Sequence, residues 1–339
     1  LERIIKETDP VRLHGYTSAQ GDMAVRAKIA GSIEKRFGFP ANKDLIYMTC
    51  GAAASLTVTL NALINSGDEV IIPAPFFPEY RVFAESVGAH VVTVMCREPD
   101  FQLDIKAIES AVTEKTKAII INSPNNPTGA VFSPDTVKAL SDMLDKKQAE
   151  YGTDIYIIAD EPYRELSYGA EVPYIPKYYA NTVVCYSYSK SLSLPGERIG
   201  YIFIPESANN SKKLYAAVCG AGRALGFVCA PSLMQYTVAE CTDALPDIST
   251  YKKNRDLLFG ALTDYGYKAV APDGAFYLFV KSPEPDANAF CERAKKYELL
   301  LVPSDDFGCE GYVRISYCVT AEQIERSLPA FKALIEEYK

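Results

Sequence analysis

The feature that most constrains the fold is a regular alternation of short apolar segments with segments of helical length. Helical patterns lie near residues 53–65, 77–87, 104–111 and 133–149. Seven segments rich in Val, Ile and Tyr look like buried strands, and they begin near residues 45, 68, 90, 116, 155, 182 and 198. Buried strands separated by helices are typical of a parallel sheet that is covered on both faces. The sequence therefore predicts an α/β fold with a mostly parallel, seven-stranded sheet flanked by helices.

The pattern changes after Pro205, where long helical segments are followed by two further strand-like segments, GAFYLFV and GYVRISYCV. We expect residues 16–240 to form a large α/β domain. Residues 1–15 and 241–339 are expected to form a smaller α+β domain together. A chain of 339 residues is long enough for two such domains.

Composition excludes several classes of function. A net charge of −8 disfavours nucleic acid as a partner, because phosphate binding requires clustered Lys and Arg. The sequence contains no run of about 18 uncharged apolar residues, so no membrane span is expected. The first residues lack the features of a signal peptide. Nine cysteines without a CxxC pair disfavour a metal site and favour reduced thiols in a cytoplasmic protein. With only His14 and His90 as histidines, proton transfer is expected of Lys, Tyr or a carboxylate.

Polar side chains follow several expected strands, at the point where each strand ends. Taken singly, Asn126 suits a turn, Asp160 could cap a helix and Lys190 could be a solvated lysine. Ligands of open α/β sheets bind outside the carboxyl ends of the strands, so we expect these groups to converge. In chain order the group comprises Asn126, Asp160, Tyr163, Ser187, Ser189 and Lys190.

This combination of side chains is the one that pyridoxal phosphate chemistry requires. A lysine amine binds the cofactor's aldehyde, and a carboxylate keeps the pyridine nitrogen protonated. Donors such as Asn126 and Tyr163 could hold the phenolate oxygen of the ring. Helix N-terminal amides, hydroxyls and an arginine are the groups that bind a phosphate. The sequence offers for that purpose the amides of Ala52 and Ala53, the hydroxyls of Ser187 and Ser189, and Arg198.

Four motifs in this order resemble the fold type I, pyridoxal-phosphate-dependent aminotransferases of class I and II. They are NPTG at 126–129, ADEPY at 159–163, SYSKSLSLPGERIGY at 187–201 and GAFY at 274–277. The resemblance extends from GYTSAQGDMAVRAKIA to YVRISYC and covers nearly the whole chain.

The resemblance implies a role for each strand-end residue. Lys190 matches the lysine that holds the cofactor, and Asp160 matches the partner of the pyridine nitrogen. Asn126 and Tyr163 match residues that bind the ring oxygen, and Asn126 is also expected beside the substrate. The family's phosphate-binding groups match Ala52, Ala53, Ser187, Ser189 and Arg198.

Other matches come from single aromatic or basic residues. Phe77 matches an aromatic residue that stacks on the cofactor, with core packing as its alternative and Phe76 as a neighbour that could pack instead. Tyr16 matches a tyrosine that reaches the phosphate in the neighbouring subunit, which implies a homodimer with shared active sites. Arg314 matches the arginine that binds the substrate α-carboxylate, with a structural ion pair as its alternative. Arg223 lies near the position of a side-chain carboxylate binder, but a surface or packing role is the favoured interpretation.

The resemblance implies reversible transfer of an amino group between an L-amino acid and a 2-oxo acid. A pyridoxal-phosphate-dependent C–S β-lyase of the same fold would share every cofactor residue and stays an alternative. A non-catalytic module that binds the cofactor is a second alternative, against which the intact Lys190, Asp160 and Arg314 argue. Which amino acid is used stays open.

Overall fold

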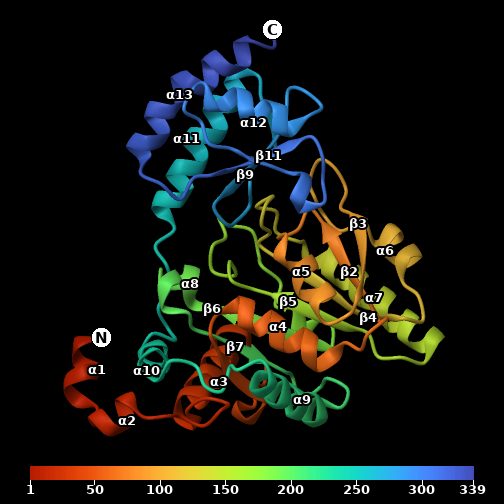
Figure 1. Ribbon diagram of the computed structural model, residues 1–339, viewed down its shortest axis with the longest axis vertical. Coiled ribbons are helices and arrows are strands. Elements are labelled where there is room, and N and C mark those ends of the chain that lie inside the picture. Colours follow the sequence, from red (N-terminus) through yellow and green to blue (C-terminus); the bar gives the residue numbers. More distant parts are fainter.

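A seven-stranded sheet forms the centre of the larger part of the protein, in a computed structural model that describes residues 1–339 (Figure 1). The strand order is β1-β7-β6-β5-β4-β2-β3, and β7 alone runs antiparallel to its neighbours. Each of the seven predicted strands is present, so the predicted α/β class is confirmed. The strands are β1 (Ile46–Thr49), β2 (Glu69–Ala74), β3 (His90–Met95), β4 (Thr116–Asn122), β5 (Tyr156–Asp160), β6 (Thr182–Ser187) and β7 (Gly200–Phe203).

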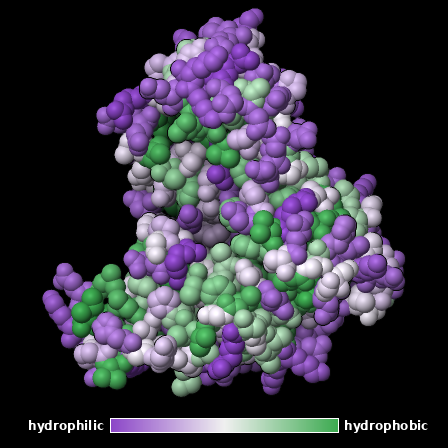
Figure 2. Space-filling view, viewed as in Figure 1, coloured by the Kyte–Doolittle hydropathy of each residue, from purple (hydrophilic) through white to green (hydrophobic).

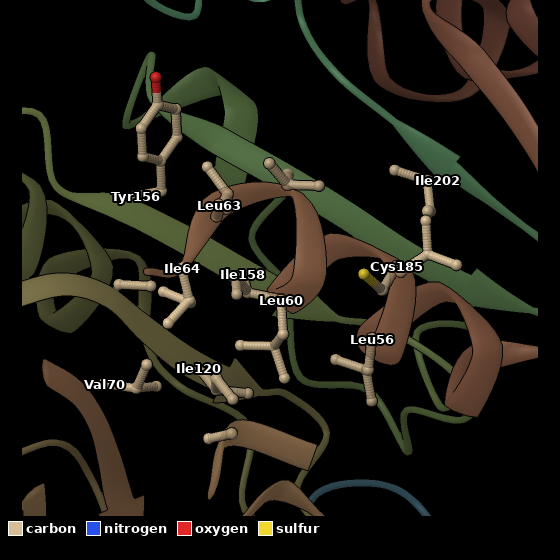
Figure 3. Packing of buried hydrophobic residues seen from close by; sticks show 14 of the residues in the cluster. Leu56, Leu60, Leu63, Ile64, Val70, Ile120, Tyr156, Ile158, Cys185 and Ile202 are labelled. Carbon is tan, nitrogen blue, oxygen red and sulfur yellow. The ribbon is translucent and has the colours of Figure 1, made fainter. Parts of the chain in front are cut away.

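Helices cover both faces of this sheet, as the continuous hydrophobicity of the strands predicts. Alternate residues of one strand face opposite layers, so Val70 and Ile72 pack under α4, α5 and α9, while Ile71 packs under α6 and α7. Figure 3 shows the first of these layers, where Leu56 and Leu60 of α4 lie over the strands. The helices of the larger part are α3 (Met23–Phe37), α4 (Ala52–Leu63), α5 (Glu79–Ser86), α6 (Ile105–Ala111), α7 (Pro134–Tyr151), α8 (Tyr188–Ser191), α9 (Ser211–Ala224) and α10 (Ser232–Glu240).

Local sequence signals explain where these helices begin and end. In α7, Ser133 accepts a hydrogen bond from the Thr136 amide and Pro134 occupies the first helical position. Gly152 ends the helix in the left-handed region with φ +67°, which costs glycine little. The four predicted helical segments coincide with α4 to α7 within a few residues.

The smaller part of the protein is built on a four-stranded antiparallel sheet in the order β10-β11-β9-β8. The segments GAFYLFV and GYVRISYCV supply its strands β9 and β11, as predicted. A separate hydrophobic core lies between this sheet and its helices. Its elements are α11 (Ser249–Tyr265), β8 (Lys268–Ala269), β9 (Tyr277–Lys281), α12 (Ala287–Lys295), β10 (Val302–Pro303), β11 (Tyr312–Ser316) and α13 (Ala321–Glu336).

The N-terminal residues pack elsewhere than we expected. Helices α1 (Glu2–Glu7) and α2 (Pro10–His14) lie beside α10, at the end of the molecule away from α11 to α13 (Figure 1). Ser232 Oγ donates to the carbonyl of Leu13 at 2.6 Å, and Arg3 pairs with Glu240 at 2.5 Å. The reason is the burial of Leu13, which is 1% exposed in this position. The structure thus does not bring residues 1–15 to the smaller part, and the remaining domain boundaries stay predictions.

None of the helices combines the length and the apolar character that crossing a bilayer requires. All nine cysteines carry free thiols.

Candidate active site

A cleft of about 330 Å³ lies at the carboxyl ends of β4, β5 and β6, where the two parts of the protein meet. Figure 2 shows the surface hollowed between these parts. Such a volume is typical of small-molecule sites. Every predicted site residue except Tyr16 lines it. The lining residues are Ala52, Ala53, Leu56, Phe77, Tyr80, Asn122, Asn126, Asp160, Pro162, Tyr163, Ser187, Ser189, Lys190, Pro195, Arg198, Tyr277 and Arg314.

Asp160 ends β5 as a buried carboxylate with one free oxygen. Its Oδ2 accepts a hydrogen bond from the Tyr80 hydroxyl at 2.5 Å, while its Oδ1 is buried without a partner. Burial raises the pKa of Asp160 to about 7, Tyr80 opposes this rise and the neighbouring Glu161 adds to it. A free carboxylate oxygen in this position can accept a hydrogen bond from a cationic ring nitrogen in the cleft.

Asn126 is held in place by Asn122, the last residue of β4. The Asn126 amide donates to Asn122 Oδ1 at 2.8 Å, and Asn122 Nδ2 donates to the Asp160 carbonyl at 2.9 Å. Asn122 therefore joins the ends of two adjacent strands. The side-chain oxygen of Asn126 accepts from Arg314 at 2.8 Å, which leaves its Nδ2 as a donor toward the cleft.

Tyr163 lies in the turn after β5, with its hydroxyl 3.0 Å from that of Tyr277. The two rings meet edge to face, with centroids 5.8 Å apart. Burial raises the pKa of Tyr163 well above its usual value, so at neutral pH the phenol keeps its proton.

Arg314 on β11 is a guanidinium without a carboxylate partner. Its Cζ lies 4.6 Å from the Tyr277 ring centroid and 5.0 Å from that of Phe307. Nη1 donates to Asn126, and Nε is buried without a partner. Since Arg314 makes no ion pair, the alternative of a structural salt bridge is wrong. A guanidinium fixed between two rings offers its free N–H groups to an incoming carboxylate.

Lys190 belongs to α8, the short turn that follows β6. Its Nζ lies 5.2 Å from the ring centroid of Phe276 and 6.0 Å from that of Tyr163. Burial lowers the pKa of Lys190, and Arg198 contributes in the same direction while Cys318 opposes it. A lowered pKa leaves more of the amine neutral and nucleophilic at neutral pH.

The start of α4 and the turn at α8 bring two hydroxyls, a guanidinium and helix amides to one end of the cleft. Ser187 Oγ accepts from the Ser189 amide at 3.1 Å, and Arg198 Nη1 donates to Ser189 Oγ at 3.3 Å. Gly51 precedes α4 with φ +84°, and a Cβ there would lie 2.6 Å from Arg198 Nη2. Glycine therefore lets the guanidinium approach the first amides of the helix, at Ala52 and Ala53. Helix amides, hydroxyls and a guanidinium together suit a phosphate.

Of the remaining aromatic and basic candidates, only Phe77 lines the cleft. Phe76 is 2% exposed and belongs to the core. Arg223 is exposed near the end of α9 and does not line the cleft. Tyr16 is 96% exposed and does not reach the cleft of its own chain.

Sequence reasoning missed three residues that position this site. Tyr80 stands inside a helical pattern that gave no sign of a contact with Asp160, which is 80 residues further on. Asn122 ends the segment AIIIN and could have been identified as a further polar strand end. Tyr277 stands in the GAFY motif but had no role assigned to it.

Comparison with known proteins identifies the family. The family model described as aminotransferase class I and II matches residues 1–331. A probable aspartate aminotransferase of Methanocaldococcus jannaschii is 30% identical, over 99% of this chain and 89% of its own length. A crystal structure of an amino transferase from Eubacterium rectale superposes with a TM-score of 0.98 at 54% identity, over 100% of this chain and 85% of that one. The structure of a variant of Thermus thermophilus aspartate aminotransferase superposes with a TM-score of 0.88 at 28% identity, over 98% of this chain and 90% of that one. The chain belongs to the class I and II aminotransferase family.

The protein is accordingly a pyridoxal-phosphate-dependent aminotransferase, and its substrates are an amino acid and a 2-oxo acid. Transamination is thus the reaction that the family and its named relatives support for this protein.

Proposed function

We propose that the cleft is the active site of this transamination and that its residues divide between cofactor and substrate. The observation that carries the proposal is Asp160 Oδ1, because a buried carboxylate oxygen without a partner suits a protonated pyridine nitrogen. When bound, the cofactor supplies an electron sink that weakens the bonds at the substrate's Cα.

The remaining cofactor contacts follow from donors that the cleft leaves free. Asn126 Nδ2 and the Tyr163 hydroxyl would donate to the ring oxygen, and Phe77 would stack on the ring face. The phosphate would lie against the start of α4 and α8. Its partners would be the amides of Ala52 and Ala53, the hydroxyls of Ser187 and Ser189, and Arg198.

Lys190 has two tasks in this proposal. Its neutral amine would hold the cofactor's aldehyde covalently, which its lowered pKa favours. Once the substrate amine has displaced it, the freed Nζ would accept the proton that leaves Cα. The aromatic rings of Phe276 and Tyr163 lie beside Nζ and contribute to the burial that lowers its pKa.

Arg314 would orient the substrate by binding its α-carboxylate. The free N–H groups of the guanidinium can form a two-point contact, which fixes the direction of Cα relative to Lys190. Among the relatives, one is named an aspartate/prephenate aminotransferase and one an aromatic-amino-acid aminotransferase. We include L-aspartate, L-phenylalanine and L-tyrosine among the candidate donors for this chain.

We further propose a homodimer in which the partner subunit's Tyr16 completes each phosphate site. The support is the exposure of Tyr16 on the segment before α3, outside the cleft of its own chain. Dimers of Tyr16→Phe should bind the cofactor more weakly. In a mixed dimer with a Lys190→Ala chain, the Tyr16→Phe chain keeps its Lys190 and receives an intact Tyr16 from the other chain. That site should regain tight cofactor binding, and no recovery on mixing would contradict shared sites. The free thiols of all nine cysteines support a cytoplasmic location.

Borohydride reduction followed by peptide mass mapping tests the proposal directly. The cofactor mass should be found on Lys190, and Lys190→Ala should lose both the adduct and nearly all turnover. Mixing the cofactor-loaded protein with each candidate amino acid should convert the cofactor to its amine form, and the absorbance of the cofactor reports this conversion. An adduct on another lysine would overturn the assignment.

A further inference from the structure

The turn after β5 carries a second set of charged residues on the side that does not line the cleft. Glu161 and Arg164 are 4% and 7% exposed, and the side chain of Glu165 is 1% exposed. Arg164 pairs with Glu161 at 2.7 Å and with Glu165 at 3.2 Å. Arg36 of α3 pairs with Glu165 at 2.9 Å. Two guanidinium groups thus neutralise two carboxylates in a buried layer, which such charges require.

One carboxylate of this layer connects to the turn that carries Lys190. Tyr186, near the end of β6, places its hydroxyl 3.0 Å from Glu165 Oε2 and 2.8 Å from Ser191 Oγ. Its ring lies under the Arg164 guanidinium, with Cζ 4.3 Å from the centroid. Ser191 is buried and directly follows Lys190 in α8.

The direction of these two hydrogen bonds follows from the charge on Glu165. Burial raises the pKa of Glu165, but Arg164, Arg36 and the Tyr186 hydroxyl together leave it below its usual value. An ionised carboxylate only accepts, so the single phenol proton of Tyr186 is donated to Glu165. The Ser191 hydroxyl then donates to the phenol oxygen, and its orientation is set by Glu165 through Tyr186.

We propose that Tyr186 is a positioning residue for Lys190, because its phenol oxygen anchors Ser191 and thereby fixes the turn from which the lysine side chain projects. This inference rests on the proposed function, since it takes Lys190 as the residue that holds the cofactor. The turn needs such an anchor because α8 is only four residues long and cannot be rigid by its own hydrogen bonds.

The test compares Tyr186→Phe with a matched control, Tyr174→Phe. Tyr174 is also a buried tyrosine of this layer, with its ring stacked 4.1 Å from that of Phe37, but its hydroxyl has no partner. Both substitutions remove one buried hydroxyl, and only one of them breaks the connection to Ser191. Ser191→Ala removes the same hydrogen bond from the other side.

Three quantities are measured on each cofactor-loaded protein: the dissociation constant for pyridoxal 5'-phosphate, the visible circular dichroism of the bound cofactor, and kcat and KM separately. For Tyr186→Phe and Ser191→Ala we expect kcat to fall about fivefold or more, the loss expected from one hydrogen bond, with KM within about twofold. The dichroism band should change in both, and the double variant should lose no more than the larger single loss. Tyr174→Phe should match the wild type in all three.

The possible outcomes distinguish a failure of the positioning role of Tyr186 from a failure of the proposed function of Lys190. If Tyr186→Phe and Ser191→Ala behave like Tyr174→Phe in kcat and dichroism, Tyr186 does not position Lys190. If Tyr186→Phe fails to fold, Ser191→Ala decides alone by the same criteria. If borohydride fixes no cofactor on Lys190 in the wild type, the proposed function itself fails.

Discussion

Removing the hydroxyl of Tyr80 gives the sharpest test of how the cleft controls its central carboxylate. Tyr80 donates to Asp160 Oδ2 at 2.5 Å, and this hydrogen bond opposes the rise in pKa that burial causes. A hydrogen bond to a charged group contributes about 1.5–3 kcal/mol, and one pKa unit corresponds to about 1.4 kcal/mol. In Tyr80→Phe the pKa of Asp160 should therefore rise from about 7 by roughly one to two units.

The consequence for cofactor binding has a definite sign. A protonated pyridine nitrogen requires an ionised Asp160, so binding weakens as the pH falls through the pKa of this carboxyl group. In Tyr80→Phe that weakening should begin roughly one to two pH units higher than in the wild type, and affinity at pH 7 should fall about tenfold.

The assay is a titration of the protein with pyridoxal 5'-phosphate, followed by absorbance between pH 5.5 and 9. Tyr174→Phe serves as the control, because its hydroxyl has no partner and lies outside the cleft. Equal pH profiles for Tyr80→Phe and the wild type would refute the reasoning, since they would mean that Asp160 is kept ionised by other groups.

Three further predictions follow from single features of the site. Gly51→Ala should weaken cofactor binding more than tenfold, because its Cβ would meet Arg198, whereas Gly67→Ala, also at positive φ but in open space, should leave binding unchanged in the same titration. Arg314→Lys should raise KM for the amino acid by about a hundredfold and leave the absorbance of the bound cofactor unchanged, since a lysine cannot make the two-point contact; an unchanged KM would contradict that role. Asp160→Asn should raise the melting temperature of the cofactor-free protein at pH 8 and have little effect at pH 4. The reason is that the pKa of Asp160 is raised in the folded state, so its ionisation costs stability as the pH rises from about 4 to about 7. Thermal unfolding at the two pH values checks it, and a lower melting temperature at pH 8 would count against it.

Much of the site could be predicted because its residues stand at the ends of strands. A buried strand is readable from its continuous hydrophobicity, and the carboxyl ends of parallel strands must meet at one edge of the sheet. Asn126, Asp160 and Lys190 could therefore be placed together from the sequence alone. Arg314 could be placed only through the resemblance, because it comes from the other sheet.

Contacts between distant segments were not predictable in the same way. The Tyr80–Asp160 hydrogen bond depends on which face of α5 meets the sheet. The link from Glu165 through Tyr186 to Ser191 depends on how the turn after β5 packs against β6 and α8. Residues 1–15 were assigned to the wrong part of the protein for a related reason, since two short helices carry no signal of which surface will bury them.

The amino-acid sequence by itself determined the layered α/β architecture, the order of the strands along the chain and the set of polar groups at their ends, because periodicity and strand-end position are local properties. Only the tertiary structure decided which partner each group meets. One oxygen of Asp160 is occupied and the other free, Arg314 lies between two rings without a carboxylate, and Arg198 reaches a helix start past Gly51. These relations depend on side chains brought together by packing, and packing is a property of the whole fold.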